Sequence, residues 1–169
     1  MNLTTKLLND ITDAPIVLIC GPICSGKSTF SKQIAQKTGY THIPVSKIVS
    51  SIVNTHDRES LQNTADQTEA ICEVLDVQIT ASMEQTGGAI VDGIRQPDII
   101  EYLFVLFGLS RITIIWIDPG VEERRLRWNI RAAAKDQGLS FDKIDKADFE
   151  MGLDKIRAWL DRISTIEYA

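Results

Sequence analysis

The chain has 169 residues and a mass of 18.9 kDa, with 44% apolar and 24% charged residues, which fits a single globular domain over 1–169. A net charge of -5 and a pI near 5.0 argue against a protein that coats long nucleic acid, because that affinity depends on many lysine and arginine contacts. No apolar run approaches the roughly 20 residues that span a bilayer, and the N-terminus lacks a signal-peptide pattern, so we expect no membrane partner and a cytoplasmic location.

The predicted elements alternate between buried strands and helices. Continuous apolar runs, or short extended segments, predict strands at 15–20, 42–45, 89–92 and 111–118. Helical spacing and terminal glycine or proline signals predict helices at 1–11, 46–53, 97–107 and 149–163. They also predict a helix that follows the loop at 21–28 and stops at residue 39, a long helix that ends at 87–88, and a helix that begins at residue 119. This alternation predicts an α/β protein with a parallel sheet covered by helices on both faces.

A complete Walker A motif follows the first predicted strand and opens the next helix. It consists of Gly21, Pro22, Ile23, Cys24, Ser25, Gly26, Lys27 and Ser28, followed by Thr29. Backbone N–H groups in such a loop, together with the helix dipole, favour a bound phosphate. The lysine would reach the β- and γ-phosphates of ATP, and the Ser28 hydroxyl would be a ligand of Mg²⁺. The motif therefore predicts an ATP site with Mg²⁺ as cofactor.

A carboxylate and an arginine follow the strand at 89–92. Asp92 stands where a Walker B carboxylate would hold Mg²⁺, directly or through water, or would take a proton from the acceptor. Gly93 allows a sharp turn, so Arg95 could face the same cleft and grip an acceptor phosphate. The alternatives are an Asp92 that caps a turn and an Arg95 that is a solvated surface residue.

Several arginines gather on the helix that begins at Pro119. Arg124, Arg127 and Arg131 share one helical face, where they could stabilise a transferring phosphoryl group. The polar stretch after them completes a helical lid over about 124–147 that could close to exclude water. Because glutamates precede the arginines, a solvated charged face is the alternative.

Other polar residues carry a weaker signal. Arg58 lies in a polar loop before a long helix and could bind an acceptor phosphate, although an unbound loop arginine is an equal alternative. His42 and His56 are isolated in the sequence, and nothing there indicates a metal pair or a catalytic base.

The order of these parts resembles the P-loop nucleoside monophosphate kinase group, particularly its dephospho-CoA kinase-like and phage deoxynucleoside monophosphate kinase branch. Segment 90–98 looks like that branch's strand-Asp-x-x-Arg element, and 57–62 is similar to its Arg-Glu-x-Leu-Gln segment. The resemblance implies a three-layer P-loop fold, with Arg58 and Arg95 as acceptor-phosphate ligands and Asp92 as a metal or acceptor contact. It also implies that Arg124, Arg127 and Arg131 belong to the lid.

The chain departs from this branch at two places. Ser46 stands where members of the dephospho-CoA kinase branch usually carry an aspartate, and the chain ends at 166–169, where a last strand would be expected.

These patterns predict phosphoryl transfer from ATP to a nucleoside or deoxynucleoside monophosphate, by a monomer or homodimer. A kinase of another small hydroxyl metabolite, such as dephospho-CoA, is one alternative. A nucleotide-dependent switch or binding module is another, although the sequence has no Asn-Lys-x-Asp segment to read guanine.

Overall fold

A parallel sheet of five strands forms the centre of the described part of the chain. The computed structural model describes residues 11, 13–53, 67–132, 139–160 and 166–168. The strands are β1 (Ile16–Cys20), β2 (Thr41–Pro44), β3 (Ala89–Ile94), β4 (Ile112–Ile117) and β5 (Ile166–Tyr168). Their spatial order is β2-β3-β1-β4-β5, and each neighbouring pair is parallel.

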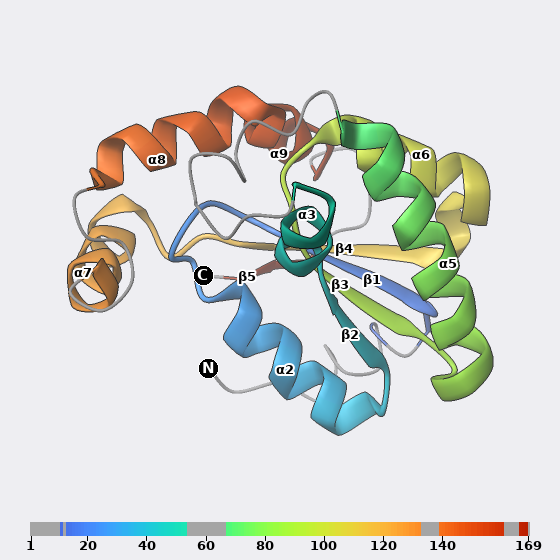
Figure 1. Cartoon of the computed structure of the whole chain (residues 1–169). Coiled ribbons are helices and arrows are strands. Elements are labelled where there is room, and N and C mark those ends of the chain that lie inside the picture. Colours follow the sequence, from blue (N-terminus) through green and yellow to red (C-terminus); the bar gives the residue numbers. More distant parts are fainter. Residues whose placement is uncertain (1–10, 12, 54–66, 133–138, 161–165, 169) are drawn as a thin grey trace.

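Helices connect the strands and cover the sheet (Figure 1). The helical elements are α2 (Lys27–Thr38), α3 (Val45–Val53), α5 (Thr68–Thr86), α6 (Pro97–Phe107), η2 (Leu109–Arg111), α7 (Val121–Ala132), α8 (Phe141–Asp148), η3 (Phe149–Leu153) and α9 (Asp154–Leu160). Figure 1 shows α2 on one side of the sheet, α5 and α6 on the other, and α7 and α8 beyond the end of the sheet at which α2 begins.

Alternate residues of each central strand pack into two separate cores, because successive side chains of a strand point to opposite faces. In β1, Leu18 joins the core formed with α3, α5, α6 and α9, whereas Val17 and Ile19 join the core formed with Phe30 and Ile34 of α2. Every residue of β1 is buried, which explains its continuous apolar sequence. The expected α/β three-layer P-loop fold is confirmed.

The structure differs from the predicted elements at β3. The strand does not end at Asp92 but continues to Ile94, and its register with β1 shifts so that Ile19 lies opposite Asp92 and Cys20 opposite Ile94. Gly93 makes this shift possible with a φ of 93°, a conformation that favours glycine. The predicted turn at Gly93 is thus a bulge within the strand.

Two further differences lie in the C-terminal third. A last strand is present at the end of the chain, since β5 pairs with β4, although residues 166–168 are too few for a strand pattern in the sequence. The polar stretch predicted to complete the helical lid contains α8, and the predicted final helix is interrupted, since the π-helical segment η3, in which Gly152 has a φ of 115°, precedes α9. The predicted helix at 1–11 lies outside the described residues except for Ile11. Of the described helices, none is long and apolar enough to cross a membrane.

Candidate functional site

The Walker A loop lies at the carboxyl end of β1, between β1 and α2. Gly21 has a φ of 139°, and a Cβ atom there would collide with the carbonyl oxygen of Ile117 at the end of β4. Only glycine fits this close approach of two backbones. The loop therefore sits against the end of a neighbouring strand, at the edge of the sheet where ligands of such folds bind.

Lys27 is folded over the loop that precedes it. Its ammonium group donates hydrogen bonds to the carbonyl oxygens of Gly21 and Pro22, both over 2.6 Å, and to Ser25 Oγ over 3.2 Å. The residue is only 8% exposed. Burial, and then the nearby charge of Arg95, lower the pKa of Lys27 from 10.5 to about 8. The amine is therefore mostly protonated at pH 7 and ready to bind an anion.

Asp92 lies in β3, beside β1 and close to Lys27, which its charge influences. It is 4% exposed, and its Oδ1 atom has no hydrogen-bond partner among the described residues. A buried carboxylate oxygen without a donor is costly, so this atom fits a cation or a donor supplied by a ligand. Ser28 is exposed at the first turn of α2, where its hydroxyl is accessible. The two residues predicted for Mg²⁺ thus have suitable chemistry.

The structure pairs Asp92 with a residue that the sequence reading treated as isolated. The Nε2 atom of His42 lies 3.4 Å from Asp92 Oδ2. β2 and β3 are parallel neighbours in which His42 lies opposite Ile90 and Pro44 opposite Asp92. The residues two apart on adjacent strands therefore project on the same face. Only the pairing of β2 with β3, which a short segment of sequence does not reveal, could have shown this contact.

Arg95 follows the bulge in β3 and reaches the lid region. Its Nε atom lies 3.1 Å from Oδ1 of Asp148, the last residue of α8. The arginine side chain is 24% exposed, whereas the aspartate side chain is fully buried. Both charges also act on Lys27. The predicted acceptor arginine therefore lies in the same charged cluster as the Walker lysine, and Asp148 is a member of that cluster which the sequence reading missed.

The predicted lid arginines differ in their surroundings. Arg124 is 3% exposed and is held by carboxylates, with Asp145 on both terminal nitrogens and Asp118 Oδ1 3.2 Å from Nε. Arg127 instead contacts the Walker loop, since its Nη1 donates to the Ser25 carbonyl oxygen over 2.8 Å. Its Nη2 pairs with Glu123, one helical turn away.

Two predicted site residues are not placed by the structure. Arg131 lies in α7, but its side chain is outside the described part, and Arg58 falls entirely outside the described residues. Their assigned roles therefore stay predictions.

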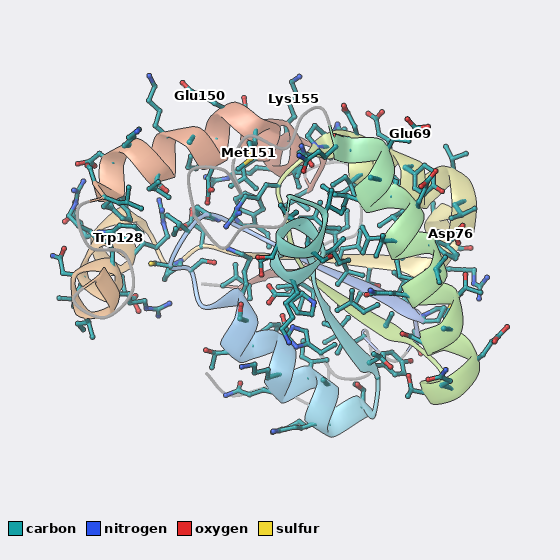
Figure 2. The ribbon with its side chains drawn as sticks, in the orientation of Figure 1. Glu69, Asp76, Trp128, Glu150, Met151 and Lys155 are labelled. Atoms are coloured by element: carbon teal, nitrogen blue, oxygen red, sulfur yellow. The ribbon has the colours of Figure 1, made fainter. Side chains whose placement is uncertain are left out.

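A small apolar cluster joins the Walker loop to α7 and α8. Ile23 of the loop is 2% exposed and packs with Trp128, Phe141 and Ile144. Trp128 meets Phe141 edge to face, with ring centroids 6.1 Å apart, and Figure 2 shows the tryptophan on α7 near α8. This cluster is separate from the two cores of the sheet. The loop and the two helices thus share buried surface as well as hydrogen bonds.

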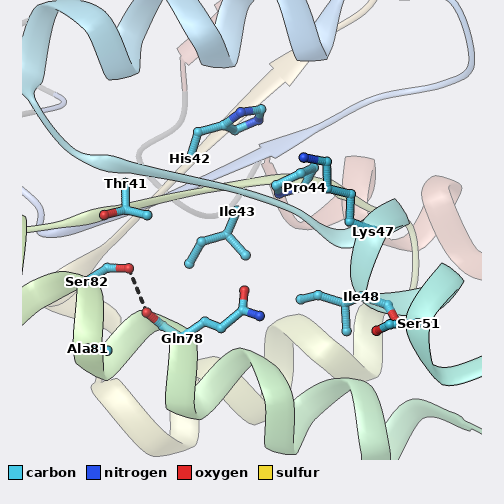
Figure 3. Close-up of a pocket in the computed structure, with 10 residues that line it drawn as sticks. All are labelled: Thr41, His42, Ile43, Pro44, Lys47, Ile48, Ser51, Gln78, Ala81 and Ser82. Carbon is cyan, nitrogen blue, oxygen red and sulfur yellow. Dashed lines mark hydrogen bonds between the residues drawn. The ribbon is translucent and has the colours of Figure 1, made fainter.

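A surface cavity of about 380 Å³ lies between β2, α3 and α5 (Figure 3). Its lining includes apolar Ile43 and Ile48 and polar Lys47, Ser51 and Gln78. In Figure 3 the ring of His42 and the side chain of Ile43 lie on opposite sides of β2. His42 also lines the cavity, so the cavity reaches the residue that contacts Asp92.

Comparison with known proteins places the chain in a family. A family model described as an AAA domain matches residues 16–156, from the start of β1 into α9. The match covers more than half of the sequence, so the chain belongs to the AAA domain family. Together with the similarity to a cytidylate kinase given below, this confirms the expected resemblance to the P-loop nucleoside monophosphate kinase-like group.

Two individual proteins are similar to the chain. The cytidylate kinase of Caldicellulosiruptor bescii (strain ATCC BAA-1888 / DSM 6725 / KCTC 15123 / Z-1320) is 28% identical over 94 residues, which are 51% of this chain and 41% of that protein. The chain thus spans less than half the length of that curated relative. A structure of deoxyadenosine kinase from M. mycoides, with the products dCMP and a flexible dCDP bound, is 14% identical with a TM-score of 0.49, covering 91% of this chain and 89% of that one.

Proposed function

We propose that the chain is an ATP-dependent kinase that transfers the γ-phosphoryl group of ATP to a nucleoside or deoxynucleoside monophosphate. The observation that carries this proposal is the charged cluster of Lys27, Asp92 and Arg95 at one edge of the sheet. A Walker lysine close to a second cation suits a reaction that brings two phosphorylated molecules together. The name of the cytidylate kinase relative agrees with this acceptor class.

The donor would bind along the Walker loop, residues 21–29. Backbone N–H groups at the start of α2 and the ammonium of Lys27 would hold the β- and γ-phosphates. Arg127, which already contacts this loop, would stabilise negative charge that develops on the transferring group. Arg124 is bound by two aspartates, so we assign it to holding α7 against α8 rather than to direct contact with ATP. Arg131 stays a lid candidate.

The acceptor would bind on the Arg95 side of the cluster, with Arg58 as a further predicted phosphate ligand. An oxygen of the acceptor phosphate forms a bond to the γ-phosphorus while the bond from that phosphorus to the β–γ bridging oxygen breaks. ADP leaves, and a nucleoside diphosphate is formed. The protein's contribution is to align the two phosphates and offset their charge, since no covalent enzyme intermediate is required.

Ser28 and Asp92 would hold Mg²⁺. The unpartnered Oδ1 atom of Asp92 supports this role. Held there, the ion would supply positive charge that offsets the charge of the donor phosphates. Within the described ranges no three His, Cys, Asp or Glu side chains form a group that could hold a metal ion.

A second candidate acceptor is a small metabolite with a free hydroxyl group, such as dephospho-CoA. The contact between His42 and Asp92 favours it. A hydroxyl must lose a proton as it attacks, and Asp92 oriented by His42 could accept that proton. An acceptor phosphate needs no such base, because its oxygens are already ionised near neutral pH. The nature of the acceptor therefore decides whether the pair has a chemical role.

An acceptor panel tests the proposal. The purified protein is incubated with ATP and Mg²⁺ and, in separate reactions, with each ribo- and deoxyribonucleoside monophosphate and with dephospho-CoA, and ³¹P NMR identifies the products. Formation of ADP with a new nucleoside diphosphate supports the first candidate, and a new phosphomonoester supports the second. If every acceptor fails while GTP binds preferentially, a switch or binding module replaces both kinase readings.

A further inference from the structure

Asp148 is a fully buried carboxylate at the end of α8. Its side chain has no exposed surface, whereas Glu150 and Lys155 farther along the chain project from the outer side of the molecule (Figure 2). Burying a carboxylate is costly unless a cation or hydrogen-bond donors compensate it. One cation beside it is Arg95, whose Nε atom lies 3.1 Å from Asp148 Oδ1.

Asp148 belongs to the inward face of α8. Phe141, Ile144, Asp145 and Asp148 have the i, i+3, i+4, i+7 spacing of one helical stripe. The first two pack on Ile23 of the Walker loop, the third binds Arg124 of α7, and the fourth binds Arg95 after β3. One helix face thus contacts the loop, the lid helix and the predicted acceptor arginine.

The geometry of the ion pair leaves one edge of Arg95 for another anion. Asp148 lies beside Nε, and within the described part of the chain no partner is recorded for the two terminal nitrogens. Those nitrogens form the end of the guanidinium fork that binds phosphate or carboxylate oxygens in pairs. The arginine side chain keeps 24% of its surface exposed, so a ligand can reach it.

We propose that Asp148 is a positioning residue, which holds Arg95 so that its terminal nitrogens face the phosphate of the acceptor. This inference rests on the proposed function and extends it. Because α8 contacts both the Walker loop, which would bind the donor, and Arg95, which would bind the acceptor, it couples the two binding sites. Without the carboxylate, Arg95 loses its ion-pair partner, and the long side chain samples other rotamers. The acceptor would then bind poorly while the donor loop keeps its contacts.

The test compares Asp148→Asn with Asp142→Asn in the full-length protein. Asp142 is a matched control, because it lies on the same helix and pairs with an arginine, Arg125, on the exposed side. For Asp148→Asn we expect the KM of the acceptor to rise by about tenfold or more, with the Kd of ATP changed by no more than about threefold. For the control we expect both constants to stay within about twofold of wild type. A purely structural aspartate would lower the active fraction without this selective change in KM.

A double-mutant cycle adds a second readout. If Asp148 acts through Arg95, Asp148→Asn should have little further effect on acceptor KM in an Arg95→Ala background, so the two changes are not additive. Full additivity overturns the proposal. If Asp148→Asn does not fold, the acceptor KM of Asp148→Glu is measured instead, because this variant keeps the negative charge but moves it by one methylene group. An unchanged acceptor KM in a folded Glu variant overturns the proposal.

The outcomes separate this inference from the proposed function. If the wild-type protein transfers phosphate and the acceptor KM is unchanged in Asp148→Asn, only the role of Asp148 is rejected. Absence of transfer by wild type to any acceptor rejects the proposed function, and calorimetric titration with the nucleoside monophosphates alone then judges the inference. Binding that weakens about tenfold in Asp148→Asn supports it, and unchanged or absent binding overturns it.

Discussion

Arg127 and Ser25 join α7 to the Walker loop, because Nη1 of the arginine donates a hydrogen bond to the serine carbonyl oxygen over 2.8 Å. Lys27 makes the same kind of contact with the carbonyl oxygens of Gly21 and Pro22. Two cationic side chains therefore donate hydrogen bonds to backbone carbonyl oxygens of the same short loop. Since hydrogen bonds between a cation and an ionised phosphate are stronger than those to a neutral carbonyl, we expect a bound polyphosphate to draw both cations toward itself.

Replacing Arg127 by Ala should lower kcat by about 10–1000-fold, because a cation that stabilises the transferring group would be lost. Arg125→Ala is the matched control, since Arg125 lies on the same helix and pairs with the exposed Asp142. Its kcat should stay within about threefold of wild type. Steady-state rates at saturating substrates measure both values. Equal losses in the two variants would contradict a specific role for Arg127.

The affinity for ATP should fall as the pH rises above about 8. Burial lowers the pKa of Lys27 to about 8, so the amine is charged below that pH and becomes neutral above it. Loss of the charge should raise the Kd by up to about tenfold per pH unit. Calorimetry between about pH 6.5 and 9.5 measures this dependence. Lys27→Arg should flatten it, because arginine stays protonated throughout this range.

The effect of His42→Gln should depend on the acceptor. With a nucleoside monophosphate we expect kcat to fall by no more than about fivefold, because an ionised phosphate needs no base. With a hydroxyl acceptor we expect a loss of about 100-fold or more, because His42 then orients the base Asp92. The experiment uses whichever acceptor the panel identifies. A large loss with a monophosphate acceptor would contradict the assignment of His42 as dispensable for that reaction.

Removing the side chain of Ile23 should loosen the lid helices from the Walker loop. Ile23→Ala leaves a cavity among Trp128, Phe141 and Ile144 and should lower the free energy of unfolding by about 2–5 kcal/mol if the lid unfolds with the rest of the chain. If the lid opens separately, amide hydrogen exchange should accelerate in α7 and α8 and not in β1. Ile130→Ala on α7 is the control, since Ile130 is 73% exposed. Unchanged unfolding and exchange in Ile23→Ala would mean that the cluster does not hold the lid.

The sequence was sufficient for the central strands and the Walker loop, since both have strong local patterns. β1 is buried on both faces and is correspondingly apolar throughout, and α2 ends at Gly39, which has the positive φ typical of a helix end. The edge strand β5 has only three residues, too few for a periodic pattern. Its existence depends on pairing with β4, which is a long-range contact.

The candidate site was predictable only where a motif carries it. Lys27 and Asp92 could be placed at one edge of the sheet because both follow predicted parallel strands. His42 and Asp148 could not be placed, because each contact is long-range: His42 and Asp92 are 50 residues apart, and Asp148 of α8 pairs with Arg95, which follows β3. α8 was missed because its inward face includes two aspartates, which make the stripe look polar although both carboxylates are paired with arginines.

Calorimetric titration of the protein with ATP in the presence of Mg²⁺ tests the central claim most directly, because that claim is that residues 21–29 hold the triphosphate of the donor. The account predicts that one ATP binds per chain. In a folded Lys27→Ala variant, the Kd of ATP should rise by about 100-fold or more. Wild-type protein that binds no purine triphosphate, or a Lys27→Ala variant that binds ATP as tightly as wild type, would contradict it.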